Sequence, residues 1–255
     1  MHILCEKPIA ISVEDADAMI DSAHENDVIL MVAESNRYDS LTEKIEEFLR
    51  ENRIGVPVFA SWNDLHKFDK WGYKDREWLN DPERVGGGHW ITRGIHLVSP
   101  LRAWFRAGGA GDVHKVYARE YRSPSFEAPE GIEGNVGAFL VFNDGQTARI
   151  NMGVEVENHH QFNEIRIHGT EGSLVASKRK NSVNLFSGDD ETTETLTLKR
   201  RSPFEKEMTH FLHCIKNNSE ARTSGIEERN SLAVIEAGYQ SIRENRAIKV
   251  NMRKK

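Results

Sequence analysis

The first 35 residues alternate between two apolar runs and one amphipathic segment, and this order limits the possible folds more than any other feature of the chain. Residues 2–5 and 28–33 are the apolar runs, and the second is uninterrupted, as in strands covered on both faces. Between them, Ser12 opens a capping box and a helix that runs to about residue 25. A strand, a helix and a strand in this order predict a βαβ crossover.

Beyond residue 56, apolar residues alternate with polar ones, which is typical of antiparallel strands with one covered face. The expected strands cover residues 58–62, 113–121, 136–142, 148–152, 163–167, 173–176, 183–186 and 196–198. Residues 143–145, Asn-Asp-Gly, predict a hairpin turn because these residues accept positive φ. The sequence therefore predicts an α/β chain with a large open mixed sheet, mostly antiparallel, and helices on one face.

Helical spacing predicts three more helices, over residues 41–49, from the N-cap Ser202 onward, and over residues 226–244. The apolar residues of the second of these recur on one stripe, which consists of Phe204, Met208, Phe211, Leu212 and Ile215. We expect this stripe to be the side of the helix that packs on the rest of the molecule.

Glu6-Lys7-Pro8 follows the first predicted strand directly. Open α/β sheets bind ligands in the crevice at the carboxyl ends of their strands. Proline fixes its own φ and restricts the residue before it, so Lys7 cannot continue into a helix. The direction of its side-chain ammonium is therefore restricted. Taken alone, the same residues also fit a solvated ion pair at a strand end.

Three glycines at 86–88 precede a second informative segment, which extends to Leu101. Glycine lets backbone approach another segment or a ligand closely, and apolar spacing places a helix directly afterwards. Thr92 and His96 are four residues apart and are expected on one helical face, bordered by Arg93. His89 and His96 equally fit a surface and a core position. They are seven apart, without a nearby cysteine or acidic ligand, so no metal site is expected.

Composition excludes several classes of protein. The formal charge is −6, from 40 acidic and 34 basic residues, which argues against a nucleic-acid or anionic-membrane surface. Only Cys5 and Cys214 are present, so no disulfide framework is expected and a reducing cytoplasm fits best. The sequence contains neither a signal-peptide pattern nor an apolar run long enough for a membrane span.

Taken together, the ordered motifs resemble the Gfo/Idh/MocA oxidoreductase family. They are Glu6-Lys7-Pro8 after an apolar strand, Asn36-Arg37 after the second strand, the triple glycine followed by Gly94-Ile95-His96, and residues 169–172, Gly-Thr-Glu-Gly. That family has an N-terminal Rossmann domain and a C-terminal α/β domain with a large open sheet. The resemblance implies a Rossmann remnant over residues 1–38 and a substrate and oligomerisation domain over residues 39–255.

The resemblance also implies roles for single residues. Lys7 matches the family's lysine that passes a proton to or from the substrate oxygen, with His96 as its partner. Many members carry an aspartate where this chain has Thr92, which can support by hydrogen bonding but holds no charge, and Ser99 replaces another. The residues expected to lie beside NAD or NADP are Glu6, Pro8, Asn36 and Arg37. A lysine with its ordinary pKa of about 10.4 is too basic for this work, so we expect burial or a neighbouring cation to lower the pKa of Lys7.

A sugar, cyclitol or related small polyol is the expected substrate. Trp90 and Arg93 beside His96 suit stacking on a ring and gripping a hydroxyl or carboxylate. Aromatic residues of the preceding loop, Trp71, Tyr73 and Trp78, would contribute to the same surface or simply pack the loop onto the sheet. Residues 158–160, Asn-His-His, fit either the site or a polar turn, with the turn favoured. A homo-oligomer through the open sheet is expected by analogy.

The dinucleotide motif G-x-G-x-x-G between a strand and a helix is nowhere in the sequence. Three explanations remain open: a 5′-truncated or mis-started reading of an oxidoreductase, a non-catalytic sugar-binding or scaffold protein, and an enzyme completed by a separate chain. We expect the chain alone to be inactive and to bind NAD(P)(H) very weakly. A βαβ unit of this kind is also expected to expose Ile3, Leu4, Val28, Leu30 and Val32 along a free sheet edge.

Overall fold

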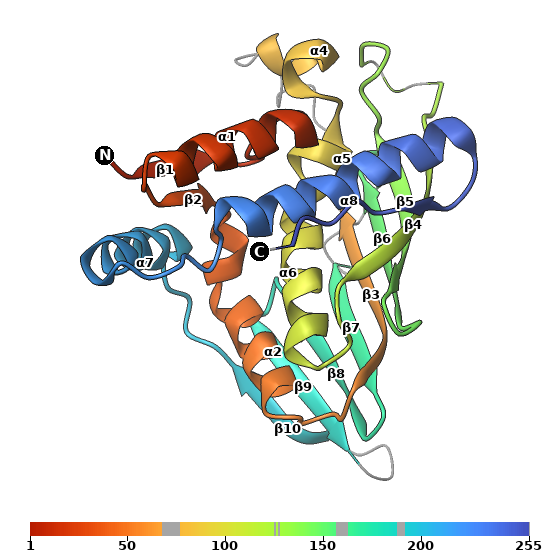
Figure 1. Cartoon of the computed structure of the whole chain (residues 1–255). Coiled ribbons are helices and arrows are strands. Elements are labelled where there is room, and N and C mark those ends of the chain that lie inside the picture. Colours follow the sequence, from red (N-terminus) through yellow and green to blue (C-terminus); the bar gives the residue numbers. More distant parts are fainter. Residues whose placement is uncertain (68–76, 125, 127, 157–162, 188–191, 255) are drawn as a thin grey trace.

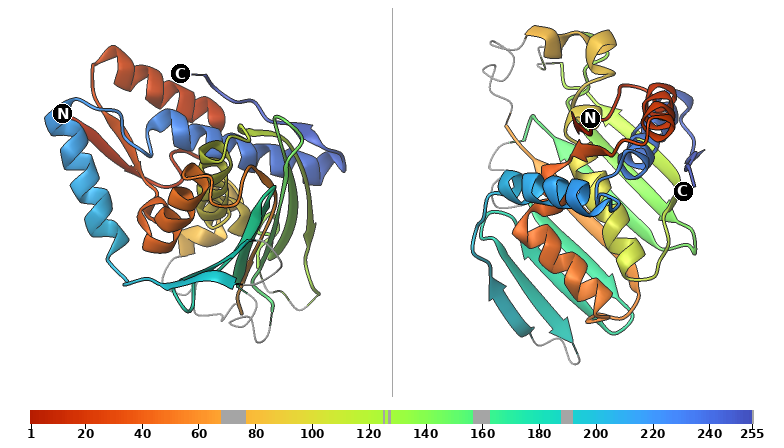
Figure 2. Two further views of the ribbon diagram at one scale, coloured as in Figure 1. Left: turned by 90° about the horizontal axis from the view of Figure 1, so that it is seen from below. Right: turned by 60° about the vertical axis from the view of Figure 1, so that its left-hand side comes forward.

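The computed structural model describes residues 1–67, 77–124, 126, 128–156, 163–187 and 192–254, and the structural statements below refer to these residues. They form a small sheet of two strands and a large sheet of nine (Figure 1). This is the architecture that the sequence predicted. Helices pack on one face of the large sheet, and no helix or strand of the described residues covers the other face (Figure 2).

The N-terminal βαβ unit forms as expected. β1 (Ile3–Glu6) and β2 (Leu30–Ala33) pair in parallel, with Glu6 opposite Ala33. α1 (Val13–Glu25) connects them, and the Ser12 hydroxyl caps this helix by accepting a hydrogen bond from the Asp15 N–H at 3.1 Å. Because the two strands run in the same direction, the residues that follow them lie at one edge of the small sheet.

The exposure of this unit was overestimated from the sequence. Met31 on β2 bridges Ser224, and the Val32 N–H donates to the Thr223 carbonyl at 2.8 Å, so a C-terminal segment occupies the second edge of β2. Leu30 and Val32 are consequently buried, Leu4 and Val28 are partly buried, and Ile3 on β1 is 42% exposed.

The large sheet has the strand order β10-β9-β8-β7-β3-β6-β5-β4-β11. Its strands are β3 (Pro57–Leu65), β4 (Val113–Tyr121), β5 (Asn135–Phe142), β6 (Thr147–Gly153), β7 (Glu164–Gly169), β8 (Gly172–Ser177), β9 (Ser182–Ser187), β10 (Thr192–Thr197) and β11 (Ile248–Lys249). Neighbouring strands are antiparallel except β3 and β6, which pair in parallel in the middle of the sheet. This one parallel pair makes the sheet mixed and mostly antiparallel, as the sequence predicted.

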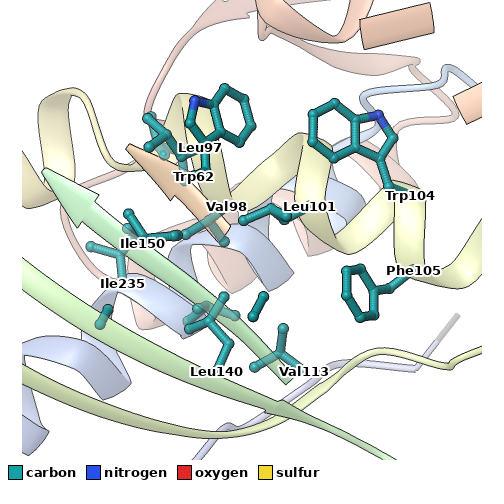
Figure 3. Packing of buried hydrophobic residues seen from close by; sticks show 14 of the residues in the cluster. Trp62, Leu97, Val98, Leu101, Trp104, Phe105, Val113, Leu140, Ile150 and Ile235 are labelled. Carbon is teal, nitrogen blue, oxygen red and sulfur yellow. The ribbon is translucent and has the colours of Figure 1, made fainter. Parts of the chain in front are cut away.

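The helices pack on the large sheet and form the hydrophobic core with it. After the 3-10 turn η1 (Ser35–Tyr38) come α2 (Ser40–Arg50), the 3-10 turn η2 (Glu77–Asn80), α4 (Pro82–Val85), α5 (His89–Thr92), α6 (Ile95–Ala107), α7 (Pro203–Asn217) and α8 (Gly225–Glu244). Trp62 of β3 stacks on Trp104 of α6 with ring centroids 5.2 Å apart (Figure 3). Phe105 of α6 stacks on Phe142 of β5 with ring centroids 3.9 Å apart. Such aromatic pairs contribute about 0.5–1.5 kcal/mol beyond the area they bury. They fix α6, and hence His96, against the sheet.

The βαβ unit packs on the C-terminal part of the chain. Asp17 of α1 pairs with Arg229 of α8 at 2.9 Å and with Arg253 at 2.8 Å. The boundary between residues 38 and 39 remains a prediction. Among the described residues, no helix combines the length and apolar character that crossing a membrane requires.

Candidate active site

Lys7 lies at the carboxyl end of β1, where the sequence placed it. The Lys7–Pro8 peptide bond is cis, and the Lys7 Nζ donates a hydrogen bond to the Thr92 carbonyl oxygen at 2.7 Å. This bond joins the small sheet to the segment that begins with the triple glycine.

A helix break makes the Thr92 carbonyl available. The sequence predicted one continuous helix, in which the His96 N–H would bond to the Thr92 carbonyl. In the structure α5 ends at Thr92 and α6 begins at Ile95, and the His96 N–H donates to Arg93 instead, at 3.0 Å. Gly94 occupies the break, where an added Cβ would lie only 2.3 Å from the Trp90 carbonyl oxygen. Thr92 and His96 therefore belong to two helices, and the Thr92 hydroxyl donates to the Gly88 carbonyl at 2.8 Å.

His96 pairs with a carboxylate that sequence reasoning missed. Its Nδ1 lies 2.7 Å from Oε1 of Glu34, whose side chain is fully buried. The Asn36 amide donates to the His96 carbonyl at 3.2 Å. Glu34 follows β2 just as Lys7 follows β1, so the strand-end argument that nominated Lys7 also pointed to Glu34.

The electrostatic surroundings of Lys7 agree in direction with the expectation. Burial lowers the pKa of its ammonium, Glu34 and Glu6 oppose this, and Arg93 lowers it further. Lys7 and His96 thus both interact with one carboxylate, Glu34.

Arg93 belongs to an ionic cluster on the inner face of the sheet. Its Nε donates to Oδ2 of Asp64 at 2.5 Å, and Nε2 of His66 lies 3.0 Å from Oδ1 of the same carboxylate. Burial alone would raise the pKa of Asp64, but His66 and the Arg93 guanidinium hold it far below its usual range. Burial, Arg93 and His66 lower the pKa of the nearby His89 to about 4. Asp64 therefore stays ionised and His89 neutral at physiological pH.

Lys178 is a second residue that the sequence did not single out. It continues the inward-facing positions Leu174 and Ala176 of β8, and its Nζ lies 4.9 Å from the centre of the Trp62 ring. Burial lowers its pKa, while Asp39, Asp64 and Glu34 raise it and Arg93 lowers it. Glu34 and Arg93 therefore act on both Lys7 and Lys178, which places the two ammonium groups around the same cluster.

Two expected site residues lie elsewhere. Trp90 is fully buried and its indole N–H donates to the Ile235 carbonyl at 3.0 Å, so its ring packs on α8 and cannot stack on a substrate. Arg37, 4% exposed, pairs with Glu46 at 3.4 Å inside the protein and does not face a cofactor. Both side chains lie in the core, Trp90 on α5 and Arg37 on the 3-10 turn η1.

The other predicted positions divide into three groups. Glu6 is exposed at the end of β1 and Pro8 is partly buried beside it. Trp78 is exposed on η2. Trp71, Tyr73 and residues 158–160 lie outside the described residues. Within the described part of the chain, no group of three or more His, Cys, Asp and Glu side chains is arranged to hold a metal ion.

Comparison with known proteins gives the class. The model of the GFO/IDH/MocA C-terminal domain matches residues 42–175, which is more than half of the chain. The model of the oxidoreductase family with an NAD-binding Rossmann fold matches residues 1–34. The chain therefore belongs to the Gfo/Idh/MocA oxidoreductase family.

Its similar proteins are sugar oxidoreductases. D-apiose dehydrogenase of Paraburkholderia graminis is 26% identical over 97% of this chain, which spans 66% of that relative. The structure of aldose-aldose oxidoreductase from Caulobacter crescentus complexed with glycerol has a TM-score of 0.83 and 22% identity, covering 98% of this chain and 72% of that one. Levoglucosan dehydrogenase in complex with NADH and L-sorbose has a TM-score of 0.84 and 18% identity, covering 99% and 74%. At these identities the solved structures show the fold alone.

The described residues do not fit the pyrophosphate of a dinucleotide. Residues 7–12, which join β1 to α1, contain no glycine. The first turn of α1 carries Glu14 and Asp15, and Ser12 already takes the Asp15 N–H. Anions bind helix N-termini that offer free N–H groups and no negative charge. The turn between β1 and α1 is therefore not a binding site for the pyrophosphate of NAD(P).

Proposed function

We propose that this chain is the substrate-binding and proton-transferring part of an NAD(P)-dependent oxidoreductase that acts on a hydroxyl or carbonyl group of a sugar, cyclitol or small polyol. The observation that carries the proposal is the convergence of the Lys7 ammonium and the His96–Glu34 pair at the carboxyl ends of β1 and β2. The names of its relatives support the substrate class.

The chain's own residues account for the proton. Oxidation of an alcohol removes the hydroxyl proton, and reduction of a carbonyl supplies one to its oxygen. Lys7, with its lowered pKa, is suited to accept or donate this proton, because a base works best when its pKa is near the working pH. Glu34 holds the His96 imidazole in place through Nδ1 and leaves Nε2 for a second contact. When bound, the nicotinamide supplies the hydride acceptor or donor.

The side chains around this pair suit a polyhydroxylated substrate. Arg93, whose side chain is 42% exposed, is held by Asp64 and presents further guanidinium N–H groups. Lys178 has no hydrogen-bond acceptor within the described part of the chain, so its ammonium is available to a hydroxyl or carboxylate oxygen.

The uncovered face of the large sheet supports a homo-oligomer. Four aromatic residues on it are more than one third exposed, namely Phe59, Tyr117, Tyr121 and Phe139. A row of exposed aromatic side chains on a flat sheet is typical of an association surface. A second copy of this chain is the partner that we propose.

The test supplies the nucleotide-binding segment that the relatives carry. Fusing the corresponding N-terminal residues of D-apiose dehydrogenase ahead of residue 1 gives a protein in which this chain's residues must perform the proton transfer. We expect turnover of NAD(P)+ with a panel of sugars and cyclitols. Lys7→Met should lower kcat by about 10²- to 10⁴-fold, since general acid–base groups contribute that much.

Lys216→Met is the matched control, because Lys216 is exposed on α7. Loss of activity in both variants would point to damage by the fusion. Full activity of the Lys7 variant would contradict the proposal. Sugar binding by calorimetry without any turnover would favour the non-catalytic sugar-binding protein instead.

A further inference from the structure

A buried pair of carboxyl groups lies behind His96. Glu34 uses Oε1 for His96, and its Oε2 has no hydrogen-bond partner among the described residues. Glu228 on α8 is 2% exposed and accepts a hydrogen bond from the Ser99 hydroxyl at 2.8 Å through Oε1. Its Oε2 is likewise without a partner within the described ranges. Each carboxyl group therefore has one satisfied and one unsatisfied oxygen.

The carboxyl groups of Glu34 and Glu228 are neighbours because their hydrogen-bond partners, His96 and Ser99, are neighbours. His96 and Ser99 are three residues apart on α6, so their side chains lie side by side on one face of the helix. Glu34, bonded to the first, thus lies beside Glu228, bonded to the second. Their charges interact: burial is the main cause that raises the pKa of Glu228 to about 7, and the charge of Glu34 is the next.

Two fully ionised carboxylates at this place would be costly. A buried charge without a partner loses its hydration and gains nothing in return. Two neighbouring buried carboxylates do not both ionise readily near neutral pH, whereas one proton held by the pair removes a charge.

Other charged groups around the pair do not replace this proton. Arg37 and Arg102 lower the pKa of Glu228, but Arg37 bonds to Glu46 and Arg102 to Asp112. The charge of Glu34 also acts on Lys7 and Lys178, but the Lys7 ammonium donates to the Thr92 carbonyl, and neither ammonium bonds to Oε2 of Glu34 within the described residues. Glu207 on α7 is acidic itself and adds no positive charge.

We propose that the carboxyl groups of Glu34 and Glu228 together hold one proton, so that the pair carries a single negative charge facing His96. His96 thereby faces one negative charge, rather than none or two. If His96 is protonated, transfer of the Nδ1 proton to Oε1 of Glu34 leaves a neutral imidazole and two neutral carboxyl groups. No net charge is created in the core by this transfer. Its use in catalysis rests on the proposed function, but the shared proton does not.

Infrared spectroscopy of the purified chain, without substrate or cofactor, tests the shared proton. The C=O stretching band of a protonated carboxyl group is followed as the pH is raised through neutrality. We expect Glu34→Gln to lower the midpoint of this titration by about one pH unit or more, because Glu228 then faces no negative neighbour. Glu228→Gln should abolish the band of this pair, since Glu34 then has no second carboxyl group with which to hold a proton.

Glu207→Gln is the control, because burial raises the pKa of Glu207 to about 7 as well, followed by the charges of Glu34 and Glu6. It should remove its own band and leave the other unchanged. His96→Leu is a milder variant, since His96 is at the edge of the core with a side chain 21% exposed. It takes away the imidazole partner of Glu34 and leaves Oε1 with the Asn36 N–H alone, at 3.1 Å, so the pair should hold its proton to higher pH. A Glu228 band whose midpoint stays the same in Glu34→Gln, or in His96→Leu, would overturn the proposal.

Discussion

At the scale of single residues, the candidate site consists of partners that are far apart in the chain. Lys7 bonds to Thr92, His96 to Glu34 and Arg93 to Asp64. The sequence nominated Lys7 and His96, because a strand end and a glycine-rich helix start are visible in it. Their partners depend on how the two sheets are placed against each other, which no local pattern encodes.

The direction of a side chain was the property that sequence reasoning predicted least well. Trp90 and Arg37 have the residue types of ligand-binding positions, yet both point into the core. Lys178 has the type of a surface residue in a basic turn, and the register of β8 turns it inward. Residue type sets what a group can do, and backbone geometry decides whether it faces a ligand.

The depressed pKa of His89 predicts acid sensitivity. Its imidazole titrates at about 4 in the folded protein and near 6.5 in the unfolded chain, so the unfolded state binds more protons between these values. The free energy of unfolding should therefore fall as the pH drops from about 6.5 to 4, by up to roughly 3 kcal/mol from this residue.

Urea unfolding of His89→Gln at several pH values checks this. The variant should lose less stability on acidification than the original protein. His24→Gln, on the exposed side of α1, is the control and should leave the pH dependence unchanged. An NMR titration that places the His89 midpoint near 6.5 would contradict the prediction.

At the scale of elements, the capping and strand patterns predicted most of the segments. Ser12 and Ser202 cap α1 and α7 as expected, and the Asn-Asp-Gly turn joins β5 to β6. The sequence predicted a mixed sheet but did not identify β3 and β6 as the parallel pair, because a half-covered strand shows the same alternation whichever way its neighbour runs.

The apolar stripe of α7 is the clearest mistake at this scale. Of its five members, Phe211 is buried, whereas Phe204, Met208 and Leu212 are 68%, 47% and 59% exposed. The helix packs chiefly on the short turn η1, which is too small to cover the whole stripe. A stripe in the sequence thus predicts the helix but not how much of it is covered.

Two phenylalanines on α7 separate these cases. Phe211→Ala should lower the free energy of unfolding by about 3–5 kcal/mol, because it leaves a cavity beside Tyr38 and Met31. Phe204→Ala should change it by less than about 0.5 kcal/mol, since that ring is already in solvent. Chemical denaturation of both variants measures the difference, and equal losses would show that the exposed part of the stripe is covered in solution.

At the scale of the whole molecule, one layer of helices leaves a wide sheet face open (Figure 2). The proposed association of two copies through this face predicts a specific variant effect. Phe139→Lys, at the centre of β5, should shift the protein to monomers without lowering its stability, because the charge faces solvent in the free chain.

Size-exclusion chromatography with light scattering measures this shift. Met208→Lys on α7 is the control, since Met208 is similarly exposed but lies off the sheet. An oligomer that persists in the Phe139 variant would rule out this face as the interface.

The bridge between Met31 and Ser224 has a consequence for how this molecule can be extended. β2 is flanked on both sides, by β1 and by the backbone around Thr223, whereas β1 has a single neighbour in the described part of the chain. The small sheet can therefore grow in one direction only. An added strand can pair only with the free edge of β1, next to Ile3. The loops of that added polypeptide would therefore lie on one defined side of Lys7.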